Sequence, residues 1–378
     1  MSLSVLPSST SALLPLDTIP TLSYKERARR SIHLASYQLG ISALYARFRR
    51  EAVATVLMYH SIPTQEESHW IDPCNSLSAQ TFEQQMRFLS RYRHVISIDQ
   101  LVQKLSQGKP IKRGTVAITF DDGYLNNLTV AAPILAKYNL PATLYLATGY
   151  VEGGKNQWAD TLYSAFRARS EHRLALADWD SAIPDSAIPD STLQDWNLTD
   201  AQQLSQAHTA LVMYLIQADV ARREALLAEI DKQLKPVAYP PRLTMNWEEV
   251  RALNDQYPNI TLGVHTANHL DLRTHSEKTA EEMSTSIQQM VEALGVRPQH
   301  FAFPYNRTCQ KSQAQVKAAD LSSAVMVAED PVVRTHTSPY AMPRLEAPRS
   351  MAILKSWTNG GFPSISRWLF NRPWVTPY

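Results

Sequence analysis

Short apolar runs alternate with amphipathic stretches through the central part of the chain. Val53–Tyr59 and Val116–Phe120 are almost continuously apolar, and the stretches after them, Phe82–Arg91 and Asn127–Tyr138, have helical spacing. The same alternation predicts further strands and helices at His94–Ile98, around Leu101, and at Thr143–Ala147, Ile260–Val264, Ala280–Leu294, His300–Phe303, Gln313–Ala319 and Ser323–Val327. Buried strands alternating with helices predict an α/β fold with a parallel sheet. The number of units favours a distorted (β/α) barrel over a small open sheet.

The stretch from about residue 151 to 243 interrupts this alternation. It contains a tandem SAIPD repeat at 181–190, which predicts a surface loop. A long helix is predicted to open at Thr199, with Gln202 completing a capping box, and to run to about Leu234. We interpret the stretch as a helical insertion between two barrel strands. It could be a lid, a rim or a dimerisation element, and the sequence does not decide among these.

The barrel domain is predicted to span residues 51–350, between an N-terminal extension at 1–50 and a C-terminal tail at 351–378. Within the extension, residues 25–50 form a basic amphipathic helix that could make a peripheral contact with an anionic membrane. The alternative is a leading helix packed on the domain with a solvated basic face. The first residues lack a secretory pattern, and no apolar run reaches about 18 residues. We therefore expect a cytoplasmic protein, with membrane association through 25–50 as the open question.

Composition narrows the functional classes only slightly. The chain has 378 residues and a formal net charge of +2, so its total charge gives no reason to expect a nucleic-acid partner. Cys74 and Cys309 stand far apart without metal-ligand spacing, and we read them as thiols in a reducing compartment.

Two adjacent carboxylates, Asp121 and Asp122, follow the predicted strand Val116–Phe120 directly. In (β/α) barrels, catalytic groups gather where the strands end. Adjacent side chains at a strand end diverge, so one carboxylate can bind a metal while the other faces a substrate. Taken alone, the Asp-Asp-Gly sequence fits equally a loop that caps the next helix.

Two histidines, His265 and His269, follow the predicted strand Ile260–Val264 and are four residues apart. On a helical turn this spacing puts both imidazoles on one face. With Asp122 they would give two nitrogens and one oxygen to a metal, leaving positions for water and substrate. Zn²⁺ is the natural expectation, and Co²⁺, Ni²⁺ or another divalent ion would accept the same ligands. A non-haem iron oxygenase uses similar ligands, but the Asp-Asp pair fits that class poorly.

A third motif, Phe301–Asn306 (FAFPYN), also stands at the end of a predicted strand. It is either a rigid aromatic turn or a loop that presents a backbone N–H to an oxyanion, as acyl hydrolysis requires.

Together the three motifs resemble the polysaccharide deacetylase family, which includes chitin, peptidoglycan and exopolysaccharide deacetylases. Its order of motifs, Thr-Phe-Asp-Asp-Gly, His-x-x-x-His and Pro-Tyr, is the order found here. The flanking sequences Met58–His60 and Trp247–Val250 also look like the family. The resemblance covers roughly residues 53–346 without the insertion, and the Phe-Ala-Phe-Pro-Tyr wording is most similar to a subgroup of bacterial exopolysaccharide-modifying members.

The resemblance implies a metal site and a general base. Asp122, His265 and His269 would hold one divalent ion, and Asp121 would deprotonate the attacking water. The backbone N–H of Tyr305, together with the metal, would hold the oxyanion.

The resemblance also implies the substrate class. Tyr124, Phe303 and Pro304 would contact an acetylated carbohydrate, which the enzyme would hydrolyse, most simply at an N-acetyl group. The sequence does not name the sugar. Two other functions stay open: a catalytically inactive carbohydrate-binding or scaffold member of a polysaccharide assembly system, and an amidase that acts on a C–N bond outside sugars.

The sequence departs from the family pattern in three places. Ala302 stands where many members carry an arginine that orients the base, and Arg344 could supply the missing charge. Asn306 replaces the usual glycine after the tyrosine. A C-terminal Leu-x-x-His motif, the usual general acid, is missing from the sequence, so His60 and His336 are the candidates to protonate the leaving amine.

Overall fold

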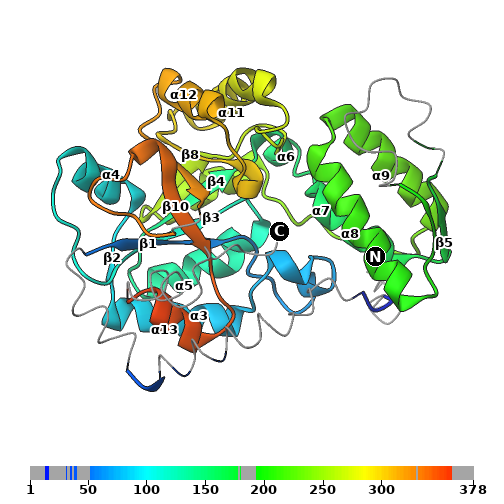
Figure 1. Ribbon diagram of the computed structural model, residues 1–378, viewed down its shortest axis with the longest axis horizontal. Coiled ribbons are helices and arrows are strands. Elements are labelled where there is room, and N and C mark those ends of the chain that lie inside the picture. Colours follow the sequence, from blue (N-terminus) through cyan, green and yellow to red (C-terminus); the bar gives the residue numbers. More distant parts are fainter. Residues whose placement is uncertain are drawn as a thin grey trace, which may run out of the picture. The chain divides into compact units, whose positions relative to one another are not determined.

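The computed structural model divides the described chain into two compact units (Figure 1). The structure describes residues 13–16, 31, 35, 38–40, 52–177, 179, 193–328 and 331–359. Most of the predicted basic helix at 25–50, the SAIPD repeat and the tail beyond residue 359 lie outside the described residues. We call the two units the barrel unit and the helical unit. Among the described residues, the barrel unit includes 52–62, 77–155 and 244–359. The helical unit includes 13–16, 63–76 and 156–243.

Seven parallel strands close into the barrel that the sequence predicted. In order around the barrel, these strands are β1 (Ala54–Tyr59), β3 (Thr115–Phe120), β4 (Ala142–Leu146), β7 (Ile260–Val264), β8 (His300–Ala302), β9 (Ser323–Val327) and β10 (Met342–Glu346). β10 pairs with β1 and so closes the ring, while the short β2 (His94–Val95) adds to β3. Because all strands are parallel, all their carboxyl ends lie at one end of the barrel.

The two longest strands are buried along their whole length. β1 and β3 pair from Ala54–Thr115 to Tyr59–Phe120, and each of their residues is buried. Burying a Val or Leu side chain fully contributes about 1.5–3 kcal/mol. Their nearly unbroken apolar sequences follow from this burial, since no strand face meets water.

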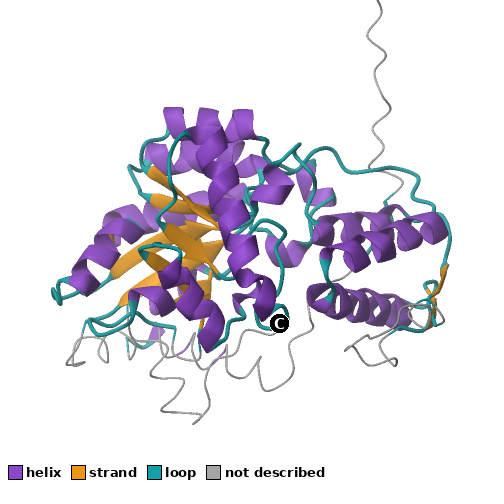
Figure 2. Cartoon of the chain, turned by 90° about the horizontal axis from the view of Figure 1, so that it is seen from above, coloured by secondary structure: helices purple, strands orange, loops and turns teal. Residues whose placement is uncertain are grey.

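Helices surround the strands of the barrel unit (Figure 2). They are α3 (Ala79–Tyr92), α4 (Ile98–Ser106), α5 (Ala132–Lys137), α6 (Thr148–Val151), α10 (Trp247–Gln256), α11 (Thr279–Leu294), α12 (Gln310–Ala318) and α13 (Met351–Trp357). The prediction of a strand over His94–Ile98 was too long, because Ser97 and Gln100 form a capping box that starts α4 at Ile98. The strand β10 was not predicted, since Pro343, Arg344 and Glu346 interrupt its apolar pattern.

The helical unit contains three longer helices and a small hairpin. These elements are α7 (Trp158–Ala168), β5 (Arg173–Ala175), β6 (Asp195–Asn197), α8 (Ala201–Gln217) and α9 (Val220–Leu234). The single helix predicted from Thr199 was wrong in two respects. The first helix is capped by Asp200, whose side chain accepts from the N–H of Gln203. The chain then breaks at Asp219, which caps α9 in the same way through the N–H of Arg222.

Among the described residues, no helix combines the length and the apolar character needed to cross a membrane. The predicted domain boundaries and the function of the insertion stay predictions.

Candidate active site

Asp121 and Asp122 diverge because the chain turns sharply after β3. The N–H of Asp121 donates to the carbonyl of Tyr59 at 3.0 Å, which continues the pairing of β1 and β3 by one residue. Asp122 then has φ 75° and Gly123 has φ 81°, both in the left-handed region. Asp tolerates this region better than most residues, and glycine adopts it readily. The turn therefore directs the two carboxylates to different partners.

Arg344 holds the carboxylate of Asp121 through two hydrogen bonds. Nη1 donates to Oδ1 at 2.7 Å and Nη2 donates to Oδ2 at 2.5 Å, and both side chains are buried. Burial alone would raise the pKa of Asp121, but the Arg344 guanidinium and the nearby His265 lower it below its usual value. Asp121 is therefore ionised at neutral pH. Arg344 comes from β10, a strand that was not predicted. Its guanidinium contacts Asp121, as was suggested from the sequence because Ala302 stands where many family members carry an arginine.

His265 follows β7, and one ring nitrogen fixes its orientation. Nδ1 lies 2.7 Å from the carbonyl oxygen of Ala302, which can only accept, so Nδ1 carries the proton. Nε2 then presents its lone pair toward Oδ1 of Asp122, at 3.8 Å, and Oδ2 of Asp121, at 3.6 Å. Burial lowers the pKa of His265 to about 4, so the ring is neutral at pH 7. A neutral histidine whose other nitrogen donates to a carbonyl is the form that binds metals.

His269 completes a group of three potential metal ligands. Its Nε2 lies 3.1 Å from Nε2 of His265 and 3.3 Å from Oδ1 of Asp122. A tetrahedral ion with bonds of about 2.0–2.1 Å would separate its ligand atoms by about 3.3 Å. The three measured separations, 3.1, 3.3 and 3.8 Å, therefore fit the edges around one first-row divalent ion. Burial would raise the pKa of Asp122, but the interaction with His269 lowers it, which keeps the oxygen ligand ionised.

His60 lies at the site, whereas His336 does not. His60 follows β1, and its Nε2 is 4.0 Å from Oδ2 of Asp121, with the side chain 20% exposed. His336 lies in the connection between β9 and β10. In that connection Val333 pairs with Ala54, the first residue of β1. His336 is thus exposed near the amino ends of the strands, opposite Asp121.

The Pro-Tyr loop packs directly on the second histidine. The Tyr305 ring meets the His269 ring edge to face at 4.5 Å, and the Tyr305 hydroxyl donates to the carbonyl of His269 at 3.1 Å. Tyr305 itself has φ 52°. Phe303 and Pro304 are buried, as is Tyr124 after the Asp-Asp pair. Their direct contact with a sugar therefore stays a prediction, and their observed contribution is to shape the loops.

Two carboxylates beside the site, the half-buried Glu346 and the buried Glu282, were not singled out from the sequence. Glu346 ends β10, and burial raises its pKa even though His60 and Arg349 act against this. Glu282 lies in the first turn of α11 and bonds the loop that carries His269. Neither position carries a sequence signal, because a lone glutamate in a helix or at a strand end is usually solvent-exposed.

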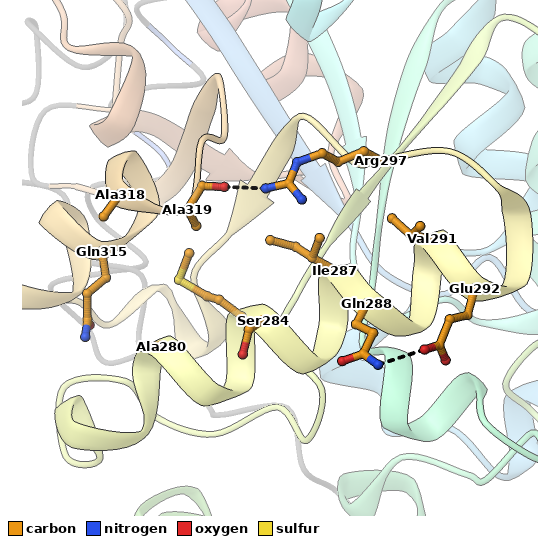
Figure 3. Close-up of a pocket in the computed structure, with 11 residues that line it drawn as sticks. Ala280, Ser284, Ile287, Gln288, Val291, Glu292, Arg297, Gln315, Ala318 and Ala319 are labelled. Atoms are coloured by element: carbon orange, nitrogen blue, oxygen red, sulfur yellow. Dashed lines mark hydrogen bonds between the residues drawn. The ribbon is translucent and has the colours of Figure 1, made fainter.

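A cavity of about 580 Å³ lies elsewhere in the barrel unit, between α11 and α12 (Figure 3). Arg297 lines it and donates to the carbonyl of Ala319 at 2.7 Å. Its apolar lining comes mainly from Met283, Ile287, Val291, Ala318 and Ala319. None of the candidate site residues lines this cavity.

Comparisons with known proteins identify the family of the chain and its fold. The sequence matches the family model for polysaccharide deacetylase over residues 108–172 and 201–324, half of the chain. YxkH of Bacillus subtilis (strain 168), whose name assigns it provisionally to the polysaccharide deacetylases, is 28% identical over 131 residues. That match covers 34% of this chain and 43% of YxkH, so the chain spans less than half the length of this relative.

Two solved structures share the fold. The deacetylase PplD of Streptococcus pyogenes, in complex with acetate, superposes with a TM-score of 0.52 at 16% identity, covering 83% of this chain and 100% of PplD. IcaB from Ammonifex degensii superposes with a TM-score of 0.51 at 14% identity, covering 82% of this chain and 97% of IcaB. By the match of its sequence to the family model, and in a fold shared with these structures, this chain belongs to the polysaccharide deacetylase family.

Proposed function

We propose that this chain is a metal-dependent hydrolase that removes acetyl groups from a carbohydrate. The convergence of Asp122, His265 and His269 beside an ionised, arginine-held Asp121 carries this proposal. A bare metal site would not require a second buried carboxylate, and a structural ion pair would not require the three ligands. Their combination is what hydrolysis of an amide or ester with a metal and a general base needs.

The three ligand atoms fit one divalent ion, and we propose Zn²⁺, with Co²⁺ or Ni²⁺ as substitutes. When bound, such an ion supplies Lewis-acid chemistry, lowering the pKa of water and polarising an acyl oxygen. The chain contributes the neutral imidazole of His265 and the ionised carboxylate of Asp122, which need not lose a proton before binding.

Asp121 is the proposed general base. Its two oxygens are fixed by Arg344, so the carboxylate cannot rotate away from the attacking water. Because its pKa is lowered, Asp121 stays ionised and able to accept the proton across the neutral range. The proton taken from water must finally reach the leaving amine, and the products are acetate and the amine.

His60 is the proposed group that passes a proton to the leaving nitrogen. It lies 4.0 Å from Asp121 and is partly exposed, so it can contact both the base and a bound substrate. The backbone N–H of Tyr305 is the proposed oxyanion donor. Its loop is held next to the metal ligands by the Tyr305 hydroxyl bond to His269.

We propose an N-acetylated sugar of a bacterial polysaccharide or exopolysaccharide as the substrate. The family of the chain supports the polysaccharide class. The wording of the FAFPY motif supports the exopolysaccharide subgroup. This motif lacks the arginine that many members carry, and Arg344 on β10 takes its place beside Asp121.

The experiment is acetate release from a panel of acetylated sugars and non-sugar amides, using apoprotein reloaded with Zn²⁺, Co²⁺ or Ni²⁺. Metal-dependent release from sugars supports the proposal, and release only from non-sugar amides identifies an amidase instead. Stoichiometric metal binding without any release would contradict the hydrolase and favour a carbohydrate-binding scaffold.

A further inference from the structure

The loop that carries both histidines has an unfavourable backbone. Thr266 has φ 65° and His269 has φ 52°, so two residues with side chains lie in the left-handed region within four positions. This region is sterically unfavourable for any residue with a Cβ. A loop in this state keeps its shape only if its surroundings hold it there.

Glu282 supplies the strongest of these restraints. Its Oε2 accepts from the backbone N–H of Asn268 at 2.8 Å, and its Oε1 accepts from Nδ2 of Asn268, also at 2.8 Å. The Glu282 side chain is buried, with 5% of the residue exposed. Two bonds from one carboxylate to one residue fix both the position and the rotation of the Asn268 peptide, which directly precedes His269.

Two further restraints come from backbone contacts. The N–H groups of Thr148 and Gly149, at the start of α6, donate to the carbonyls of Thr266 and Ala267 at 3.1 and 2.8 Å. A Cβ at Gly149 would lie 2.7 Å from the Ala267 oxygen, so only glycine permits this approach. These bonds hold the first half of the loop. In the second half, where His269 stands, the Thr266 hydroxyl accepts from the His269 N–H at 3.0 Å and the Tyr305 hydroxyl donates to the His269 carbonyl. Glu282 is the charged side chain that holds this half, through Asn268.

We propose that Glu282 is a positioning residue for the metal site: through Asn268 it sets the geometry of His269 and thereby the affinity for the metal. The inference rests on the proposed metal ligands Asp122, His265 and His269. Partners of metal ligands that lie outside the coordination sphere typically change metal affinity by about 10–100-fold when removed.

The first test is Glu282→Met, which keeps the length of the side chain. A thioether accepts hydrogen bonds only weakly, so both bonds to Asn268 are lost. We expect Co²⁺ affinity to fall by about tenfold or more. The visible absorption of bound Co²⁺ should change as well, because it reports the coordination geometry, which a purely structural residue would leave unaltered.

The double variant Asn268→Asp with Glu282→Gln is the rescue. It exchanges the two groups, so the amide at position 282 donates to the carboxylate at position 268 and accepts its backbone N–H. The total charge is unchanged. We expect the double variant to regain Co²⁺ affinity to within about threefold of wild type, whereas Asn268→Asp alone opposes two carboxylates and should bind as weakly as Glu282→Met or more weakly.

Glu281→Met is the matched control, because Glu281 is the exposed neighbour of Glu282 in the first turn of α11. Affinities come from Co²⁺ titration of apoprotein and from competition between Zn²⁺ and a chelator, and thermal unfolding of each apoprotein checks folding. Wild-type affinity and spectrum in Glu282→Met would overturn the inference. If Glu282→Met does not fold, the double variant decides, and weak binding by a folded double variant would overturn it. Failure of the wild type to bind any metal would instead contradict the proposed function itself.

Discussion

The barrel carries a histidine–aspartate cluster at each of its two ends. At the carboxyl ends of the strands, His265 and His269 meet Asp121 and Asp122. At the amino ends, His300 lies at the start of β8 and its Nε2 contacts Oδ1 of Asp99 at 2.8 Å. The other ring nitrogen, Nδ1, lies 2.9 Å from the Ser323 hydroxyl. Serine, histidine and aspartate thus stand in a row, as in a hydrolase triad, yet Ser323 is fully buried.

The difference between the clusters lies in how the ring nitrogens are used. Both nitrogens of His300 are bonded within the protein, and among the residues that the structure describes His300 is not part of a group of three potential metal ligands. In His265 one nitrogen is bonded to a backbone carbonyl, and the other converges with atoms of Asp122 and His269. A histidine with two satisfied nitrogens ties elements together, whereas convergent lone pairs make a binding site. The arrangement of the ring nitrogens therefore distinguishes a potential binding site from a structural contact. The residue types, histidine and aspartate in both clusters, do not.

The largest contrast should appear in metal binding by His269→Ala and His300→Ala. Removing His269 takes away one of three ligands, so Co²⁺ affinity should fall by more than about a hundredfold, beyond the usual effect of an outer partner. His300→Ala should stay within about threefold of wild type. Titration of the two apoproteins measures both. Comparable losses in the two variants would mean that the amino-end cluster also acts on the metal.

Stability should show the reverse contrast. His300→Ala leaves the buried Ser323 hydroxyl and Asp99 without their common partner, which should lower the free energy of unfolding by about 1–3 kcal/mol. The apoprotein of His269→Ala should lose less, because without a metal the main change is the loss of the close approach of two ring nitrogens, 3.1 Å apart, while alanine keeps the same left-handed backbone. Urea unfolding of both apoproteins tests this, and a larger loss in His269→Ala would reverse our interpretation.

The next contrast concerns the pH dependence of catalysis, which should report the pKa of Asp121. In Arg344→Met, burial still raises the pKa of Asp121 while the cation that lowers it is gone. The acid limb of kcat/KM should therefore move to higher pH, by about 1–3 units. The rate is measured from pH 4 to 9, with Arg349→Met as a control that does not contact Asp121. An unshifted limb in Arg344→Met would show that Asp121 is not the group that titrates.

Asp99 should give the smallest effect. The hydrogen bond with His300 lowers the pKa of Asp99, so this carboxylate adds stability above its unfolded-state pKa, and that stability is lost as pH falls through the folded value. Because the side chain is about half exposed, the contribution should stay below about 1 kcal/mol. Asp99→Asn should therefore be slightly less stable than wild type at pH 7, and the gap should close below about pH 4. A gap that widens in acid would contradict this account.

The barrel and its motifs could be predicted because they follow local rules. Buried parallel strands are apolar on both faces, and this makes β1, β3 and β7 recognisable in the sequence as short apolar runs. Arg344 was proposed from a missing charge, but its strand was not, since a proline and two charged residues hide the apolar pattern. Only the closing of the barrel brings β10 next to β1 and so places the guanidinium on Asp121.

Other features could not be read from the sequence, because they depend on contacts between distant segments. His60 and His336 were both candidates from the sequence, His60 the favoured one, and the strand order places them at opposite ends of the barrel. Glu282 looked like any glutamate at a helix start, since its partner Asn268 is recognisable only in three dimensions. The apolar pattern from Thr199 to Leu234 predicts one continuous helix. In the structure the helix ends before Asp219, whose side chain accepts from the N–H of Arg222 and so starts a second helix.

The most direct test of the central claim compares acetate release by Asp121→Asn and Asp99→Asn at equal metal occupancy. Both variants replace one aspartate that contacts a histidine, at opposite ends of the same barrel. We predict that Asp121→Asn binds metal as wild type does but loses about 10²–10⁴-fold in turnover, as expected for a missing general base. Asp99→Asn should keep its turnover within about twofold. Full turnover in Asp121→Asn, or an equal loss in both variants, would contradict the assignment of the active site.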